Sequence, residues 1–179
     1  MRSYFDAPGF DLNRESIVNH ETHSSSASSH AGKSHYKHLL IMTILSFIAM
    51  YVLMYAMVDR LENVHHNLNQ FYMAGLMTAS MVIIELIVMR SMYHDKRQNV
   101  MLGAVGVVAL IAFFLFIRAQ TAISDRQFLR SMIPHHAGAI LMCEQAAISD
   151  AGIRRLCQEI VSAQRTEIDQ MKAKLAELH

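Results

Sequence analysis

Three long apolar runs constrain the fold of this 179-residue chain more than any other feature. They cover residues 39–58, 71–89 and 100–117, and the only charged residue in them is Glu85. A helix rises about 1.5 Å per residue, so each run is long enough to cross a hydrocarbon core of about 30 Å. Three such runs are too many for the core of a small soluble domain. We therefore predict a three-helix transmembrane anchor over residues 39–118, with Gly103 and Gly106 as small packing residues in its third helix.

The segments on either side of the anchor are polar. Residues 1–38 are rich in serine and hold too few apolar side chains to build a core, which predicts a disordered tail. Its histidines form a set able to chelate transition metals weakly: His20, His23, His30, His35 and His38. Residues 119–179 form a separate polar domain. The formal net charge of the chain is +1, so nothing in its composition favours nucleic acid as a partner.

Basic residues in the connections indicate how the anchor is oriented. Two lysines precede the first run, three basic residues separate the second run from the third, and one arginine separates the first run from the second; in that order they are Lys33 and Lys37, then Arg90, Lys96 and Arg97, and then Arg60. The positive-inside rule therefore places the N-terminus and the second connection in the cytoplasm. The first connection and residues 119–179 are then extracytoplasmic, although Arg118, Arg126 and Arg130 reduce the difference.

Glu85 and a set of methionines are the unusual residues inside the runs. An ionisable side chain within a span is costly unless it faces a partner or a cavity, and Arg90 is close enough for Glu85 to snorkel toward the interface. The methionines form two stripes: Met50, Met54 and Met57 in the first run, and Met73, Met77, Met81 and Met89 in the second. The stripes fit either a sulfur path for Cu(I) or ordinary apolar packing, and packing is the commoner role of methionine in helices.

After Arg118 the spacing of apolar residues predicts two amphipathic helices. Ser124 and Gln127 resemble a capping box that starts the first helix, which runs to about residue 148 and is kinked by Pro134 near Ser131. Residues 149–152 are predicted to form a turn in which Gly152 is free to adopt a positive φ. The second helix runs from about residue 153 to residue 178. Its apolar stripe comprises Ile153, Leu156, Ile160, Val161, Ile168 and Leu175, so the two helices form an antiparallel hairpin.

Register across this hairpin brings unusual side chains together. Facing residues have numbers that sum to about 300, so Cys143 faces Cys157, His136 faces Gln164, and Met132 lies near Met171. His135 and Glu167 flank these positions. Buried imidazole, amide and carboxylate groups cost free energy unless they are satisfied, and a metal ion would satisfy them. Mixed sulfur, nitrogen and oxygen donors suit copper as Cu(I) or Cu(II), in a chain with 14 methionines and 11 histidines. The candidate ligands are Met132, His135, His136, Gln164, Glu167 and Met171; the alternative is ordinary packing and hydrogen bonding.

Two further pairs of residues are candidates for the site. Cys143 and Cys157 have three open roles: a disulfide if their compartment is oxidising, ligands of soft copper, or small buried apolar residues. His65 and His66 lie in the first connection, on the side of the membrane predicted for residues 119–179. They are either a first point of metal capture or solvated polar residues.

The motif Met132-Ile133-Pro134-His135-His136 carries a resemblance to a known family. With the preceding residues from Ser124, the following Ala139, Ile140 and Met142, and the later Gln164, Glu167, Ile168 and Met171, it resembles the bacterial domain-of-unknown-function family 305 over about residues 120–178. The resemblance implies a ferritin-like helical fold, an extracytoplasmic location in many members, and copper binding or copper tolerance in some. The family's motif positions correspond to Met132, His135, His136 and Met171. The chain looks like a membrane-anchored variant, which implies a bacterial inner membrane.

We therefore expect an all-α protein in which three transmembrane helices precede a ferritin-like antiparallel helical hairpin. The expected function is extracytoplasmic copper capture for tolerance or delivery, with the lipid bilayer and a metal ion as partners. We expect no enzyme, because the sequence has no nucleophile–base set and no Glu-x-x-His pair of the di-iron type. Two alternatives stay open, a metal-dependent membrane redox enzyme and a helical oligomerisation module without metal. A homo-oligomer is also open, because three spans in one copy do not form a convincing transport pore.

Overall fold

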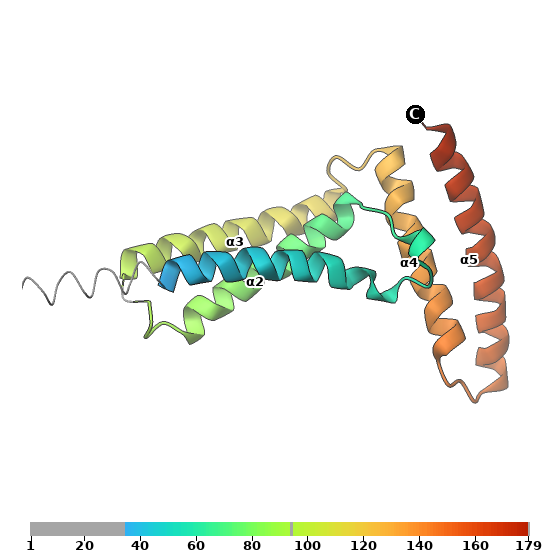
Figure 1. Ribbon diagram of the computed structural model, residues 1–179, viewed down its shortest axis with the longest axis horizontal. Helices are drawn as coiled ribbons and strands as arrows, with labels where there is room; N and C mark the ends of the chain where they lie inside the picture. The colour runs from blue at the N-terminus through green and yellow to red at the C-terminus, as the bar shows by residue number, and fades with distance from the viewer. Residues whose placement is uncertain (1–34, 94, 179) are drawn as a thin grey trace, which may run out of the picture.

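The computed structural model describes residues 35–93 and 95–178, and every regular element in those two ranges is a helix. Three long helices form a bundle, and a hairpin of two further helices lies across one end of it (Figure 1). The predicted disordered tail lies outside the described residues as far as residue 34. His35 and His38 instead belong to the first helix of the bundle. The all-α fold class is confirmed.

The bundle consists of the three predicted spans. They are His35–Met57, whose last turn is the 3₁₀ helix η1 (Met54–Met57), then α2 (Leu68–Val88) and α3 (Lys96–Ala119). All three are long and apolar enough to cross a membrane. Each begins three or four residues before the apolar run that predicts it. For α2 and α3 the reason is a polar N-cap: Asn67 accepts a hydrogen bond from the Gln70 amide, and Asp95 accepts from the amides of Arg97 and Gln98.

Glycine allows α2 and α3 to pack closely. A Cβ atom at Gly75 would lie 2.5 Å from the ring of Phe113, and one at Gly106 would lie 3.0 Å from Ile83. The prediction for Gly106 is therefore confirmed, and Gly75 has the tighter contact although the sequence does not single it out. A Cβ atom at Gly103 would meet nothing within 4 Å, so its predicted packing role is wrong. Gly103 and Gly106 are three residues apart and share a face of α3, but only Gly106 lies directly against α2.

Glu85 finds its partner just beyond the end of α2. The hydroxyl of Tyr93, a buried residue in the second connection, donates to Glu85 Oε1 at 3.1 Å. Burial, and then the bond to Glu85, raises the pKa of Tyr93 to about 12, so the phenol keeps its proton and donates. The carboxylate is thus bonded to a residue at the end of the bundle.

The hairpin consists of α4 (Asp125–Gln145) and α5 (Ala151–Glu177). Its core contains Ile133, Ala137 and Ile140 from α4 against Ile168 from α5, with Val58, Val161, Met171 and Leu175 packed around them. Val161, Ile168 and Leu175 recur every seven residues, as the predicted stripe requires. The sequence also predicts Ile153 and Leu156 in that stripe, but both are about half exposed and this part of the prediction is wrong. The interface between α4 and α5, called the seam below, therefore uses the later part of α5.

The connection between α4 and α5 differs from the prediction. α4 ends at Gln145, and α5 begins at Ala151 because the side chain of Asp150 accepts a hydrogen bond from the Ile153 amide at 2.8 Å. Gly152 therefore lies in the first turn of a helix. No glycine in the described ranges has a positive φ, so Gly152 does not use the freedom that the predicted turn would have given it, and its placement in the turn is wrong.

Pro134 lies within an unbroken α4 and helps to dock this helix on the bundle. Proline has no amide hydrogen, so the carbonyl of Arg130 loses its donor within the helix. Asn67 Nδ2, at the start of α2, lies 3.5 Å from that carbonyl oxygen. The predicted capping box forms only in part. The Gln127 amide donates to the Ser124 side chain, but the Gln127 side-chain Oε1 accepts from the Leu68 amide of α2 at 3.1 Å. The first connection and α4 thus lie at the same end of the bundle (Figure 1).

Candidate functional site

His136 lies in the seam between α4 and α5. Its Nδ1 is 2.9 Å from the carbonyl oxygen of Met132, and its Nε2 is 2.9 Å from Glu167 Oε2. The His136 side chain is only 12% exposed, whereas that of Glu167 is 49% exposed. The carbonyl and the carboxylate are both hydrogen-bond acceptors, so each nitrogen of the ring faces an acceptor. The structure pairs His136 with Glu167 rather than with the predicted Gln164, which lies one turn earlier on α5. The side chain of Gln164 makes no hydrogen bond with the described part of the chain.

This arrangement orients the imidazole as metal-ligating histidines are oriented. In such sites one ring nitrogen donates to a backbone carbonyl or a carboxylate, and the other faces the metal. With Nδ1 held by the carbonyl of Met132, Nε2 and the carboxylate of Glu167 form an adjacent nitrogen and oxygen pair. Met171, the other predicted seam ligand, packs against the apolar core of the hairpin. Within residues 35–93 and 95–178, no three His, Cys, Asp or Glu side chains form a group able to hold a metal.

His135 and Met132 face the other way, toward the end of the bundle. They line a cavity of about 500 Å³ between α4, η1, the start of α2 and the end of α3. The His135 ring lies 6.0 Å from that of His136, at 66° to it. It is exposed and makes no hydrogen bond or ion pair with any described residue. The six predicted ligands are therefore divided between the two faces of α4 rather than gathered in one seam.

The cavity is unusually rich in methionine. Five of its sixteen lining residues are methionine, against 14 of 179 in the whole chain, so the bias is local rather than compositional. They are Met54, Met57, Met73, Met132 and Met142. The sequence places Met54 and Met57 on one face of the first span, but nothing in its pattern brings that face to Met132; the docking of α4 does.

The polar residues of the cavity bond to one another. Asn69 and Gln120 exchange two amide hydrogen bonds, at 3.1 and 3.2 Å, and Asn69 Nδ2 lies 3.3 Å from Ser131 Oγ. The five methionine sulfurs have no hydrogen bond in the described structure. No lining residue carries a carboxylate, an ammonium or a guanidinium group. The cavity therefore combines neutral sulfur donors and one imidazole with a wall of amides that are already satisfied.

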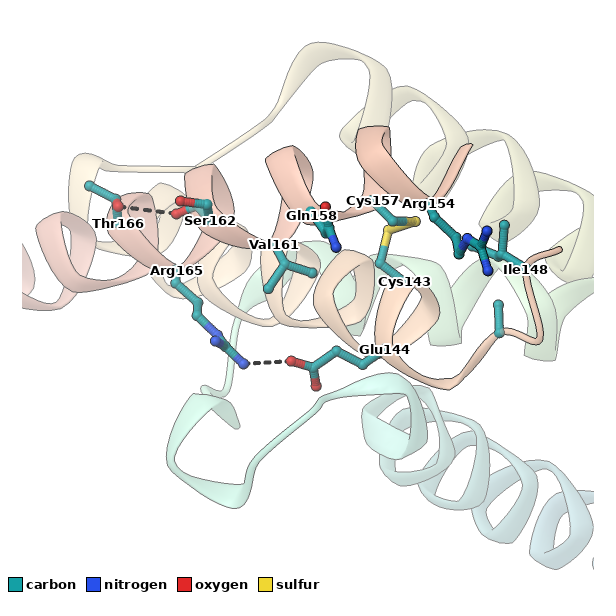
Figure 2. Close-up of a pocket in the computed structure, with 11 residues that line it drawn as sticks. Cys143, Glu144, Ile148, Arg154, Cys157, Gln158, Val161, Ser162, Arg165 and Thr166 are labelled. Atoms are coloured by element: carbon teal, nitrogen blue, oxygen red, sulfur yellow. Dashed lines mark hydrogen bonds and ion pairs between the residues drawn. A yellow bond between two sulfur atoms is a disulfide. The ribbon is translucent and has the colours of Figure 1, made fainter. Parts of the chain in front are cut away.

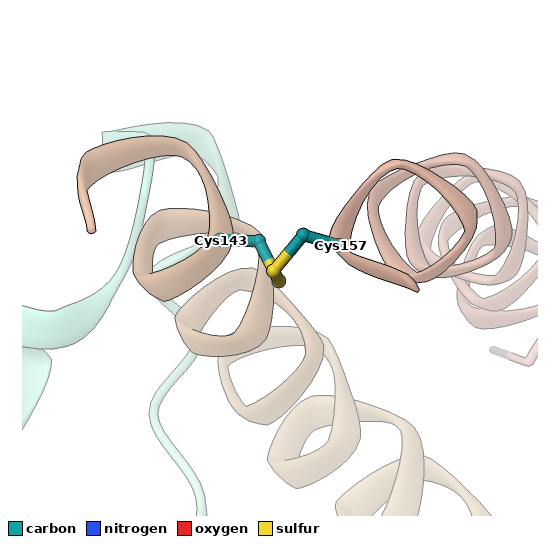
Figure 3. The surroundings of a disulfide bond; sticks show 2 residues. All are labelled: Cys143 and Cys157. Carbon is teal, nitrogen blue, oxygen red and sulfur yellow. A yellow bond between two sulfur atoms is a disulfide. The ribbon is translucent and has the colours of Figure 1, made fainter. Parts of the chain in front are cut away.

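Cys143 and Cys157 form a disulfide between α4 and α5, with Cα atoms 5.2 Å apart (Figure 3). This pairing is the one that the hairpin register predicts. Metal binds to the thiolate, so the bonded cysteines are not ligands in this state. A pocket of about 700 Å³ lies beside the disulfide, spanned by an ion pair between Glu144 and Arg165 (Figure 2). Both side chains of that pair are substantially exposed, so the disulfide is the stronger link at this end of the hairpin.

His65 and His66 lie near the end of the first span and do not line the cavity. His66 Nδ1 is 3.3 Å from the Tyr51 hydroxyl, and the two rings are stacked. The backbone carbonyl oxygen of His65 accepts a hydrogen bond from the Tyr55 hydroxyl at 2.9 Å, which ties the first connection to the first span. The neighbouring Asn67 does line the cavity. These contacts fold the first connection back on its own span, and metal capture by this pair stays a prediction.

Comparisons with known proteins agree with the motif on α4. A family model described as "Domain of unknown function (DUF305)" matches residues 87–175, and so takes in α3 as well as the hairpin. "Uncharacterized protein L153" of Acanthamoeba polyphaga mimivirus is 34% identical over 143 residues, which are 78% of this chain and 91% of that protein. That relative therefore covers most of the anchor too. No solved structure matches. The chain belongs to the family described as Domain of unknown function (DUF305).

Proposed function

We propose that this protein is a membrane-anchored copper-binding protein that captures the metal outside the cytoplasm, for tolerance or delivery. The observation that carries the proposal is the placement of adjacent His135 and His136 on α4. The His136 ring is oriented by a backbone carbonyl and lies beside Glu167, whereas the His135 ring lies beside Met132 with neither nitrogen bonded to a described residue. Imidazole suits copper in both oxidation states, and thioether sulfur suits Cu(I). Helix α4 thus offers nitrogen and sulfur donors within about one turn, and α5 adds the carboxylate oxygen of Glu167.

The proposed location follows from the basic residues and from the packing of the first connection. Lysine and arginine in the N-terminal segment and in the second connection favour a cytoplasmic side for both. The first connection contacts α4 directly, which fits a common side for these two parts of the chain. A disulfide in the hairpin suits an oxidising compartment. An alkaline phosphatase fused to the C-terminus is expected to be active in a bacterial host, because that enzyme needs an oxidising compartment.

The central test measures copper bound per chain. The protein is purified in detergent, loaded with Cu(I) without oxygen, desalted and analysed for metal. The triple variant Met132→Ala/His135→Ala/His136→Ala is expected to lose the bound copper. The double variant His65→Ala/His66→Ala removes another adjacent histidine pair that does not line the cavity, and it is expected to keep most of the metal. Equal binding by the triple variant and the wild type would overturn the proposal.

A further inference from the structure

We infer that the methionine-lined cavity between the bundle and α4 is a site for a monovalent soft metal ion, Cu(I) or Ag(I), to which the membrane anchor supplies ligands. This inference rests on the proposed copper function and deepens it, because it assigns the oxidation state and a ligand set. The site takes Met54 and Met57 from η1, Met73 from α2, and Met132, His135 and Met142 from α4. Met132 is the only one of these six residues that both belongs to the Met-x-Pro-His-His motif of α4 and carries a sulfur donor.

The donor set points to Cu(I) rather than Cu(II). Thioether sulfur is a soft, neutral ligand that selects Cu(I), whereas carboxylate and water suit harder ions. The cavity holds five thioethers and no carboxylate. An uncharged cavity would leave a divalent ion without a compensating anion, and an uncompensated charge costs more as the charge rises. The seam on the opposite face of α4 does contain a carboxylate, Glu167, so the two faces of the helix differ in the ions they suit.

The donors are available without breaking existing bonds. The sulfurs of the five methionines have no hydrogen bond among the described residues, and neither ring nitrogen of His135 has one. The amides of Asn69 and Gln120 satisfy each other and therefore do not compete for these donors. His136 differs, because a metal at its Nε2 would have to displace or share Glu167.

The fold holds the three contributing elements together. Asn67 at the start of α2 reaches the Arg130 carbonyl that Pro134 leaves without a helical donor. Gln127 caps the Leu68 amide. At the other edge of the cavity α4 approaches η1 closely, since a Cβ atom at Gly138 would lie 3.5 Å from the carbonyl oxygen of Met57. An isolated hairpin would lack the three methionines of the anchor.

The test replaces the anchor's methionines by leucine, which has similar volume and no sulfur donor. Met54→Leu/Met57→Leu/Met73→Leu is compared with Met77→Leu/Met81→Leu/Met89→Leu, which changes three methionines of the anchor outside the cavity. Leu-for-Met exchanges are well tolerated in packed regions. Affinity for Ag(I), and for Cu(I) in competition with a chromophoric chelator, is measured on the full-length protein in detergent. We expect the first variant to bind at least about tenfold more weakly, as for disturbed metal sites generally, and the second to match the wild type.

Each outcome separates this inference from the proposed function. If the cavity variant binds like the wild type while the Met132/His135/His136 variant loses metal, the anchor supplies no ligand; the inference is overturned and copper binding stands. If wild type and both of those variants bind alike, or none binds, both fail. Equal weakening by the control leucine variant also overturns the inference.

A second measurement uses only the wild type, so it tests the inference even if the circular dichroism of the cavity variant shows that it fails to fold. Copper X-ray absorption on the Cu(I)-loaded wild type is expected to show several sulfur neighbours around the metal. A coordination shell of nitrogen and oxygen alone would overturn the inference.

Discussion

The two faces of α4 differ in how completely their side chains are satisfied. On the face toward α5, Ile133, Ala137 and Ile140 are almost fully buried and both nitrogens of His136 have partners. On the face toward the anchor, Met132, His135 and Met142 line a cavity, and their side chains make no hydrogen bond with any residue that the structure describes. Successive helical residues are about 100° apart, so neighbouring histidines fall on opposite sides of this division. One face stabilises the hairpin, and the other leaves donors free to bind.

Removing volume from the seam face should give the largest effect. Ile133 is fully buried, and Ile133→Ala is expected to lower the free energy of unfolding by about 2–5 kcal/mol, because the cavity it leaves cannot fully close. The matched change on the other face is Met142→Ala, at a side chain that is 54% exposed, with an expected loss below about 0.5 kcal/mol. Guanidinium chloride unfolding followed by circular dichroism measures both. Equal losses would show that the two faces are not distinct in stability.

Breaking the disulfide should give the next largest loss of stability. The loss should again be confined to the face of α4 that packs on α5. The bridge joins residues 14 apart, and closing a loop of about that length stabilises a fold by about 3 kcal/mol. Cys143→Ser/Cys157→Ser should therefore unfold at lower denaturant concentration, and reductant should lower the midpoint of the wild type but not of the variant. Ag(I) affinity should stay unchanged, because neither cysteine lines the cavity. A parallel loss of Ag(I) binding would link the two faces.

The sequence predicts each face of α4 to a different extent. The hairpin register follows from the turn and from helical periodicity, so the pairing of Cys143 with Cys157 is confirmed and His136 is only one turn from its predicted partner. The spans follow from length and polarity. The cavity does not follow from either, because periodicity within a hairpin cannot say which face meets the anchor. That choice depends on Asn67 and Arg130, which are 63 residues apart and joined through a carbonyl freed by proline.

Loosening the contact between α4 and the anchor should have a smaller effect on stability and a clear one on binding. Asn67 is a buried N-cap of α2 that also reaches Arg130, whereas Asp95 caps α3 at the opposite end of the bundle. Asn67→Ala and Asp95→Ala should each cost about 1 kcal/mol as lost caps. Only Asn67→Ala should also weaken Ag(I) binding, because of these two caps only Asn67 contacts α4. Titration of both variants with Ag(I) checks this, and unchanged affinity in Asn67→Ala would contradict it.

The smallest expected effect comes from the ion pair in the seam. Glu167 is about half exposed, so its pairing with His136 should contribute only about 0.2–1 kcal/mol, and the contribution should fall as salt screens it. Glu167→Gln keeps an oxygen that accepts from Nε2, so most of the hydrogen bond and the orientation of the ring should survive. The control is Glu159→Gln, an exposed residue of α5 for which no change is expected. Unfolding in low and high salt measures both. A loss of several kcal/mol in Glu167→Gln would mean that this exposed carboxylate, rather than the apolar core beside it, holds the seam together.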